Sequence, residues 1–482
     1  MNKRKNLLRI SDADLIIKRK EKLKGITLEI FRGDYIGIYG LNGSGKSLLS
    51  ALIAGGLKIS SGSRDEADGL QTEVVSSTER KKMLEEDRHN DDSEFMEGRV
   101  DPGRSVRDIL GTDSSDGEIK RWSKSFGIEH ILERGIRFLS TGEFRKMMIV
   151  RSILAKPDIL VLDDPYTGLD IETRGLLEER LDEIRGEVGS LVLVSGRLDD
   201  LNSAHRLFLL QDGSISEHPD LGTIRKESMY DTPEMPVFEN AEGADKNSSQ
   251  SETELIRLTG VGMSYYDEKI LNDINWTVKS GEHWQITGPN GSGKSSLLSL
   301  INGDSPKAYG QEIYLFGRKR GSGETVWEIK QNIGLVSGSL QRQHRISQNV
   351  LSVVISGFFD SIGLYDKPDP VQIDKARDWC AEFGIMQLLD KPFDSLSEGM
   401  KRSVLIIRAI VKKPRLLILD EPCQGLDDVN SGFVIKMTER VIERDHSTLL
   451  YVSHDPMYRM HAIDNVMSLV PHYEGGYTAE IS

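Results

Sequence analysis

Short apolar runs that end in polar or glycine-rich segments recur along the chain. Continuous apolar runs cover residues 159–162 and 416–419, and an aspartate follows each of them. Runs of this length between polar segments are typical of strands buried on both faces of a parallel sheet. The apolar stretches at 147–154 and 404–411 predict helices with a buried face. The pattern therefore predicts an α/β fold built on buried parallel strands.

The same pattern occurs twice. The block GLNGSGKS at 40–47 returns as GPNGSGKS at 288–295, which is 248 residues later. The block VLDDP at 161–165 returns as ILDEP at 418–422, which is 257 residues later. The block LSTGE at 139–143 returns as LSEGM at 396–400, and TGLD at 167–170 returns as QGLD at 424–427; both copies follow 257 residues later. Four blocks in one order at nearly constant spacing indicate an internal duplication.

The segment between the two copies has a different composition. Residues 220–254 contain nine acidic and three basic residues, a net charge of −6, and include the polar tract 247–251. This composition favours an extended, self-repelling linker, and a short folded segment around 235–238 is the alternative. The predicted organisation is a first domain at 1–218, an acidic flexible linker at 219–254 and a second domain at 255–482.

Composition narrows the classes of function. The 482 residues include 62 basic and 76 acidic ones, a net charge of −14, which argues against a protein held mainly by nucleic-acid phosphates. Two cysteines, Cys380 and Cys423, are too few for a disulfide framework or a cysteine-rich metal cluster. The most apolar stretch, 350–359, is too short to span a bilayer. We therefore expect a cytoplasmic protein without a transmembrane segment, peripheral on the inner face of the plasma membrane if it acts there.

Both glycine-rich blocks are predicted to cradle phosphate. Each follows a short β-rich run and opens an apolar helix, which is the context that a P-loop requires. Glycines let successive backbone N–H groups point toward one centre, and the helix N-terminus adds its positive end. The lysine would reach the β- and γ-phosphates, and the serine would bind Mg²⁺. The predicted phosphate-binding residues are Gly40, Asn42, Gly43, Ser44, Gly45, Lys46 and Ser47 in the first copy and Gly288, Asn290, Gly291, Ser292, Gly293, Lys294 and Ser295 in the second.

An aspartate ends each of the two predicted buried strands. Asp163 and Asp420 stand at a carboxyl end, beside the place where the P-loop begins. A carboxylate there is positioned to hold Mg²⁺, directly or through water, together with Ser47 or Ser295. A simple helix cap is the alternative interpretation.

In this order, and twice over, the P-loop, the LSxG-type block, the strand ending in a carboxylate pair and the GLD loop resemble the ATP-binding cassette (ABC) ATPases. The resemblance implies two tandem P-loop nucleotide-binding domains, each with a RecA-like α/β core and a helical subdomain that carries the LSxG signature. It also implies ATP and Mg²⁺ as cofactors. Three stretches are similar, more narrowly, to twin-cassette ATP-binding proteins associated with molybdate transport: 281–304, 315–330 and 356–365.

The resemblance further implies that the two domains pack head to tail as an intramolecular pseudo-dimer in a monomeric chain. Each ATP would lie between one P-loop and the other domain's signature. The second P-loop would be completed by Ser140 and Gly142, and the first by Ser397 and Gly399. Glu143 and Met400 replace the family's usual glutamine in these signatures, so contacts at that corner differ from the family pattern.

Two of the three predicted differences between the sites concern catalysis. Glu421 matches the family's water-polarising glutamate, where the first copy has the shorter Asp164. A misplacement of about 1 Å can cost on the order of 100-fold in rate. His454 matches the residue that contacts the γ-phosphate, where the first copy has Gly196.

The third difference is the platform for adenine. Tyr265, which lies 29 residues before Lys294 and precedes Tyr266, matches the aromatic residue that stacks on the base, and the same count from Lys46 reaches Ile17. An ordinary strand aromatic is the alternative interpretation. All three differences weaken the same site, so we expect the second P-loop site to hydrolyse ATP and the first to bind it and turn over slowly.

Three functions are compatible with these features. The first is the ATPase component of an ABC transporter, which would need a separate membrane permease. The second is a soluble ATP switch that acts on the ribosome or another nucleic acid; the acidic linker disfavours it, whereas the basic turn at 318–320 leaves room for it. The third is a twin-cassette sugar-importer subunit, against which the stretches at 315–330 and 356–365 argue.

Overall fold

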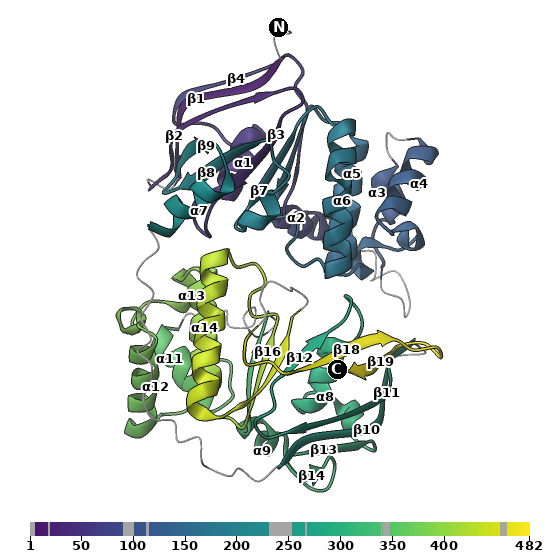
Figure 1. Ribbon diagram of the computed structural model, residues 1–482, viewed down its shortest axis with the longest axis vertical. Coiled ribbons are helices and arrows are strands. Elements are labelled where there is room, and N and C mark those ends of the chain that lie inside the picture. Colours follow the sequence, from purple (N-terminus) through teal and green to yellow (C-terminus); the bar gives the residue numbers. More distant parts are fainter. Residues whose placement is uncertain are drawn as a thin grey trace. The chain divides into compact units, whose positions relative to one another are not determined.

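The computed structural model describes residues 5–17, 20–89, 101–111, 115–230, 253–265, 268–338, 340, 348–453 and 460–482. The chain divides into two compact units, Met1–Thr232 and Pro233–Ser482. Each unit contains a mainly parallel sheet, a group of helices and an antiparallel layer (Figure 1). The predicted duplicated α/β architecture is therefore confirmed.

The first unit is built on a six-stranded sheet. Its strand order is β5-β6-β7-β3-β8-β9, and only β9 runs antiparallel to its neighbour. The strands are β3 (Tyr35–Tyr39), β5 (Thr72–Val75), β6 (Ile159–Asp163), β7 (Leu191–Ser195), β8 (Arg206–Gln211) and β9 (Ser214–His218). Every residue of β3, β6 and β7 is buried, as the continuous apolar run at 159–162 predicts.

Two layers cover this sheet. An antiparallel sheet in the order β2-β1-β4 shares one apolar cluster with α1; its strands are β1 (Asn6–Ile17), β2 (Lys20–Phe31) and β4 (Ser61–Glu66), and α1 is Lys46–Ile53. Helices on the other side share a second cluster. Figure 1 shows α3 and α4 beside α5, apart from β1 and β4. These helices are α2 (Ser77–His89), α3 (Val106–Leu110), α4 (Asp116–Ser125), α5 (Thr141–Leu154) and α6 (Ile171–Glu187).

The second unit joins both kinds of layer into one ten-stranded sheet in the order β14-β13-β10-β11-β19-β18-β12-β17-β16-β15. A single parallel bridge between Leu271 of β11 and Tyr477 of β19 connects the antiparallel layer to the parallel core. The strands are β10 (Glu254–Tyr265), β11 (Glu268–Lys279), β12 (Trp284–Thr287), β13 (Glu312–Leu315), β14 (Arg318–Lys319), β15 (Ile333–Ser337), β16 (Leu416–Asp420), β17 (Thr448–Val452), β18 (Asn465–Pro471) and β19 (Tyr477–Ile481).

Helices of the second unit repeat the arrangement of the first. Helices α11, α12 and α13 contact one another, and α14 packs on α13. The helices are α8 (Lys294–Ile301), α9 (Val326–Gln331), α11 (Val350–Ile355), α12 (Pro370–Glu382), α13 (Glu398–Ile410) and α14 (Asp428–Asp445). None of the helices in the described part of the chain has the length and apolar composition that a bilayer span requires.

The predicted linker is partly structured at its start. Residues 221–230, which lie inside the predicted range 219–254, form α7 (Leu221–Tyr230). Ile224 of this helix is fully buried in the first unit's apolar cluster, and Ser228 is nearly so. Because Ile224 packs into this cluster, the folded first unit extends to the end of α7 at Tyr230. The segment around 235–238 lies outside the described residues.

The hairpin of β13 and β14 contains a buried ion pair. Arg320, in the basic turn at 318–320, is 3% exposed, and its Nη1 donates to Glu324 Oε1 at 2.6 Å. Glu324 also accepts from the N–H groups of Gly321 and Ser322, at 2.7 and 2.9 Å. Lys319, by contrast, pairs with Glu312 at the surface. The basic turn therefore presents two cations to solvent and buries the third.

Replacement of Glu324 by alanine should leave the Arg320 guanidinium buried without its partner. We expect a loss of at least about 2 kcal/mol in the free energy of unfolding, measured by urea denaturation. Glu312→Ala, which removes the exposed ion pair with Lys319 and an exposed hydrogen bond from the Tyr314 hydroxyl in the same hairpin, is the matched control and should change little. Equal losses in the two variants would contradict the role given to burial.

Candidate functional site

The first P-loop runs from the end of β3 to the start of α1. Its glycines Gly43 and Gly45 have φ angles of 93° and 106°, a region that favours glycine. A Cβ atom on Gly45 would lie 2.8 Å from Leu23 Cδ2. The second P-loop repeats this geometry between β12 and α8, where Gly291 and Gly293 have φ angles of 84° and 90°. Both predicted glycine blocks thus form the loops expected from the sequence.

A buried lysine lies inside each loop. Lys46 Nζ donates to the Gly40 carbonyl at 2.8 Å and lies 3.4 Å from Asn42 Oδ1. Lys294 Nζ donates to the carbonyls of Gly288 and Pro289 at 2.7 and 2.9 Å. Because both lysines are at most 9% exposed, each loop holds a positive charge in a place of low solvent access, where an anion would be attracted strongly.

Unsatisfied polar atoms mark the same two loops. Ser44 Oγ and Ser292 Oγ are buried, and neither has a hydrogen-bond partner among the described residues. Asp163 Oδ1 is also buried without a hydrogen-bond partner among the described residues. Buried polar groups are rarely left unpaired, so these atoms, together with the glycine backbone and the lysine, fit a bound phosphate chain and its metal ion.

The carboxylate that ends β6 is buried beside the first P-loop, and the one that ends β16 is partly buried beside the second. Burial raises the pKa of Asp163 to about 6. The charge of Asp164 adds to this rise, and a hydrogen bond from Ser47 opposes it. Burial and the charge of Glu421 likewise raise the pKa of Asp420 to about 6. The described residues contain no cluster of three His, Cys, Asp or Glu side chains that could hold a metal by themselves. A Mg²⁺ ion would therefore bind one carboxylate and one serine hydroxyl, and phosphate oxygens and water would complete its shell.

Asp164 and Glu421 occupy matching backbone positions. Their φ angles are 48° and 52°, and their N–H groups donate to Val194 O and Val452 O at 2.8 and 2.9 Å. Non-glycine residues in this left-handed region are uncommon and are concentrated at functional sites. The two positions therefore share one backbone conformation. They differ in the length of the side chain and in the residue that ends the neighbouring segment, Gly196 in the first copy and His454 in the second.

The surroundings of Asp164 restrain its carboxylate. The N–H of Gly196 donates to Asp164 Oδ1 at 3.1 Å, and Lys46 Nζ lies 4.0 Å from Asp164 Oδ2. Gly196 is the residue that stands where the second copy has His454. His454 itself lies outside the described residues, as does Tyr266, so its predicted contact with a γ-phosphate stays a prediction.

A buried network lies behind Gly196. Ser195 Oγ, at the end of β7, donates to Asp200, and Arg174 Nη2 donates to Asp200 Oδ1 at 2.6 Å. Burial raises the pKa of Asp200 to about 6, although Arg174 opposes this shift. Nothing in the local sequence pattern predicts this network, because its members come from α6, from β7 and from the turn after it.

The two signature segments begin their helices differently. Ser140 caps α5, where its Oγ accepts from Glu143 N at 3.2 Å and Glu143 Oε2 accepts from Ser140 N at 2.8 Å. Ser397 caps α13 through Met400 N at 3.3 Å, and methionine offers no return bond. The replacement of the usual glutamine thus gives a closed capping box on the first signature only, and the spacing S-x-x-E at 140–143 is a sequence signal for it.

Both glycines of the signatures are buried, and Gly399 lies in close contact with a neighbouring helix. Gly142 and Gly399 lie in the first turn of their helices and are buried. A Cβ atom on Gly399 would lie 2.0 Å from Asn430 Oδ1, so any larger residue there would require the Asn430 side chain to move. Whether these signatures complete the opposite P-loops, as predicted, concerns both units together and stays a prediction.

Tyr265 ends β10 with its side chain accessible. It is 47% exposed, and Lys307 Nζ lies 4.9 Å from the centre of its ring. An exposed ring of this kind can stack on a purine base. The corresponding strand end of the first unit carries Ile17, so the two strand ends differ in this aromatic side chain. That Tyr265 stacks on adenine stays a prediction.

These features define a class of protein. A glycine-rich loop that leads from a buried parallel strand into a helix, with a lysine inside it and an aspartate at the end of a nearby strand, is the site of a P-loop nucleotide-binding protein, and this chain contains it twice. A model of the family described as "ABC transporter" matches residues 23–167 and 271–424. The chain belongs to this family.

Similar proteins support this assignment along nearly the whole chain. It is 37% identical over 462 residues to the ABC transporter ATP-binding protein ModF of Escherichia coli (strain K12), a match that covers 93% of each chain. This match confirms the predicted resemblance to a twin-cassette ATP-binding protein. It is 31% identical over 306 residues to the uncharacterized ABC transporter ATP-binding protein C323.04 of Schizosaccharomyces pombe, which covers 62% of each chain.

Solved structures show the same tandem fold. The archaeal ribosome recycling factor aABCE1, in complex with the ribosomal stalk protein aP1, has a TM-score of 0.66 at 17% identity and covers 97% of this chain and 89% of that chain. A structure of RNase-L Inhibitor has a TM-score of 0.64 at 18% identity, with 97% and 90% covered. At these identities the likeness concerns the fold alone.

The raised pKa of Asp200 gives a testable pH dependence. Since its pKa is about 6 in the folded chain, against 3.8 for an unperturbed aspartate, the folded chain holds a proton that the unfolded chain has lost between these values. The free energy of unfolding should therefore fall as pH rises from 4 to 6, and this contribution should disappear in Asp200→Asn.

Urea denaturation at half-unit steps from pH 4.5 to 7 measures this dependence. The wild-type slope should exceed that of Asp200→Asn by roughly 1 kcal/mol per pH unit over the lower half of the range. Parallel curves for the two chains would show that Asp200 is ionised in the folded protein throughout the range.

Proposed function

We propose that the chain is a Mg²⁺-dependent ATPase in which the second P-loop site hydrolyses ATP and the first mainly holds it. One observation carries this proposal: Asp164 and Glu421 share one backbone conformation, and the Asp164 side chain is one methylene shorter and accepts a hydrogen bond from the Gly196 N–H. A carboxylate that is set back and hydrogen-bonded is a poor base for water.

The residues of the second site would have separate roles in binding and hydrolysis. The N–H groups of 288–295 and Lys294 would bind the phosphates, and Ser295 and Asp420 would hold Mg²⁺. The ion would supply charge neutralisation at the transferred phosphate. Glu421 would orient and polarise the attacking water, and His454 would contact the γ-phosphate. The site would be completed by Ser140 and Gly142 from the first unit.

The first site would bind the same phosphates through 40–47, with Ser47 and Asp163 as metal ligands. Ser397 and Gly399 would complete it. ATP held there would keep the two cassettes together while the second site turns over. One monomeric chain would thus contain two composite sites of unequal rate.

Replacement of Glu421 by glutamine tests the assignment of the base. Glutamine keeps the size of the side chain but cannot accept a proton, so we expect steady-state ATP hydrolysis to fall by about 100-fold or more. Asp164→Asn, the matched change in the first unit, should reduce the rate less than about threefold. ATP binding, measured by equilibrium titration, should persist in both variants. An equal loss in the two variants would mean that both sites hydrolyse ATP.

We further propose that this ATPase serves a separate membrane permease at the cytoplasmic face, of the molybdate type. The support is its likeness to a protein named as an ABC transporter ATP-binding protein, 37% identical over 462 residues. The alternative is a soluble ATP switch on the ribosome. The net charge of −14 and the burial of Arg320 in the basic turn count against it, since fewer cations then remain for RNA phosphates.

A comparison of ATPase rates separates these roles. The purified chain should hydrolyse ATP without RNA, and ribosomes from its native cell should change the rate less than twofold, because the proposed partner is a membrane protein. Glu421→Gln, trapped with ATP, should then co-purify with membranes. Strong stimulation by ribosomes, or recovery of the trapped variant with them, would favour the alternative.

A further inference from the structure

Ser195, the last residue of β7, connects three parts of the first site. Its carbonyl accepts from the Gly40 N–H, at the start of the P-loop, at 3.1 Å. Its hydroxyl donates to the buried carboxylate of Asp200. The next N–H along the chain, that of Gly196, donates to Asp164 Oδ1 at 3.1 Å. One strand end therefore contacts the P-loop, the carboxylate that follows β6 and the buried network.

The charges behind this strand end are buried and paired. Asp200 is 6% exposed, and besides the Ser195 hydroxyl it binds Arg174 of α6, whose Nη2 donates to Asp200 Oδ1 at 2.6 Å. The Arg174 guanidinium also lies 4.9 Å from the centre of the ring of Tyr166, two residues after Asp164. Because breaking a buried ion pair is costly, this pair holds α6 and the turn after β7 in one arrangement.

Asp164 and the network influence each other electrostatically. Burial raises the pKa of Asp200 to about 6; Arg174 opposes this rise, and the charge of Asp164 adds to it. The Asp164 side chain is 39% exposed and lies 4.0 Å from Lys46 Nζ, so its carboxylate faces solvent on one side and accepts the Gly196 N–H on the other. A displacement of that N–H would release one carboxylate oxygen.

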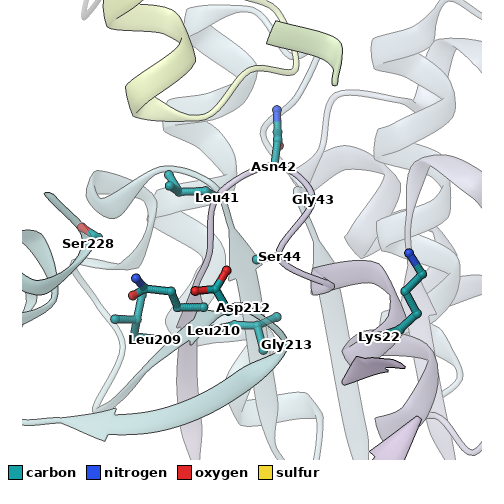
Figure 2. A pocket seen from close by; sticks show the side chains of 11 residues that line it. Lys22, Leu41, Asn42, Gly43, Ser44, Leu209, Leu210, Asp212, Gly213 and Ser228 are labelled. Atoms are coloured by element: carbon teal, nitrogen blue, oxygen red, sulfur yellow. The ribbon is translucent and has the colours of Figure 1, made fainter. Parts of the chain in front are cut away.

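The network contacts the P-loop from one side. In the sheet, β3, which leads into the loop, has β7 on one side and β8 on the other. A cavity of about 440 Å³ borders the loop on the β8 side, and Asp212 and residues of β2 and α7 also line it (Figure 2). Ser195 lies at the end of β7, on the opposite side. The loop is therefore tied to the network on the β7 side and open to a cavity on the β8 side.

The second unit has different residues at the positions of the buried ion pair. The offset of 257 residues between the copies places Ser431 at the position of Arg174. Ser431 is fully buried, and its Oγ has no hydrogen-bond partner among the described residues. Tyr458 holds the position of Asp200 in the sequence and lies outside the described residues. Neither serine nor tyrosine is charged at neutral pH, so these positions carry an ion pair in the first copy and none in the second.

We propose that Asp200, held by Arg174, is a positioning residue that keeps the first site slow. Through Ser195 it fixes the Gly196 N–H on the Asp164 carboxylate, and an oxygen that already accepts this bond is less available to take a proton from water. The inference rests on the function proposed above and adds a cause for the slow rate. The first site retains a base, and the buried network restricts its access to water.

The test uses the full-length chain with Glu421→Gln, in which the residual ATPase rate reports on the first site. Ser195→Ala and Asp200→Asn, each added to this chain, should raise the residual rate at least about fivefold, because each removes a bond that fixes the turn. The affinity for ATP, measured by equilibrium titration, should change less than about twofold. A role in folding alone would lower the rate and the affinity together, so a gain in rate separates positioning from stability.

Two controls accompany these variants. Asp199, the neighbour of Asp200, is 38% exposed and lies 3.5 Å from Arg225 at the surface, so Asp199→Asn should leave the residual rate unchanged. Asp164→Asn, added to the chain with Ser195→Ala, should abolish the gain, because Asp164 is the base that the network restrains.

Absence of a gain in both Ser195→Ala and Asp200→Asn, or a gain that persists with Asp164→Asn, would overturn the inference alone. If one of the two variants fails to fold, the other decides. A Glu421→Gln chain that keeps most of the wild-type rate would overturn the proposed division between the sites, and with it the premise that the first site is slow.

Discussion

The structure depends on the burial of opposite charges at the carboxyl ends of parallel strands. In the first unit the Lys46 ammonium and the Asp163 carboxylate are both nearly inaccessible to water; in the second unit Lys294 is buried and Asp420 is partly buried. The carbonyls of the P-loop hold each ammonium, whereas burial and a carboxylate neighbour raise the pKa of each aspartate. A phosphate chain with a divalent cation would satisfy the lysine and the aspartate together, which is why nucleotide binding follows from the fold.

Much of this arrangement could be predicted from the sequence because its signals are local. The glycines of 40–47 and 288–295 specify a loop by their backbone freedom, and the apolar runs at 159–162 and 416–419 specify buried strands by their composition alone. Because the chain is duplicated, each of these patterns occurs twice. The capping box at 140–143 was equally visible as a spacing of serine and glutamate, although its closed geometry appeared only in the structure.

Other features could not be predicted because residues far apart in the chain create them. The bond from Gly196 to Asp164 joins two strand ends that are 32 residues apart. The cavity at Asp212 brings β2, β8 and α7 to one loop. The helix at 221–230 is stabilised by one buried isoleucine within a polar segment, and the burial of Arg320 depends on a glutamate that folds back onto its own turn. Composition gave no indication of any of these.

The left-handed backbone at Asp164 and Glu421 has a consequence for how duplicated cassettes diverge. A β-branched or bulky side chain is costly at such a φ angle, whereas aspartate is tolerated there. One copy can therefore exchange glutamate for aspartate with the fold intact, and lose chemistry in a single conservative step. The loss of hydrolysis in one half of a tandem ATPase then has little steric cost. Selection can convert a second hydrolytic site into a site that only binds nucleotide, with no change in the packing of the core.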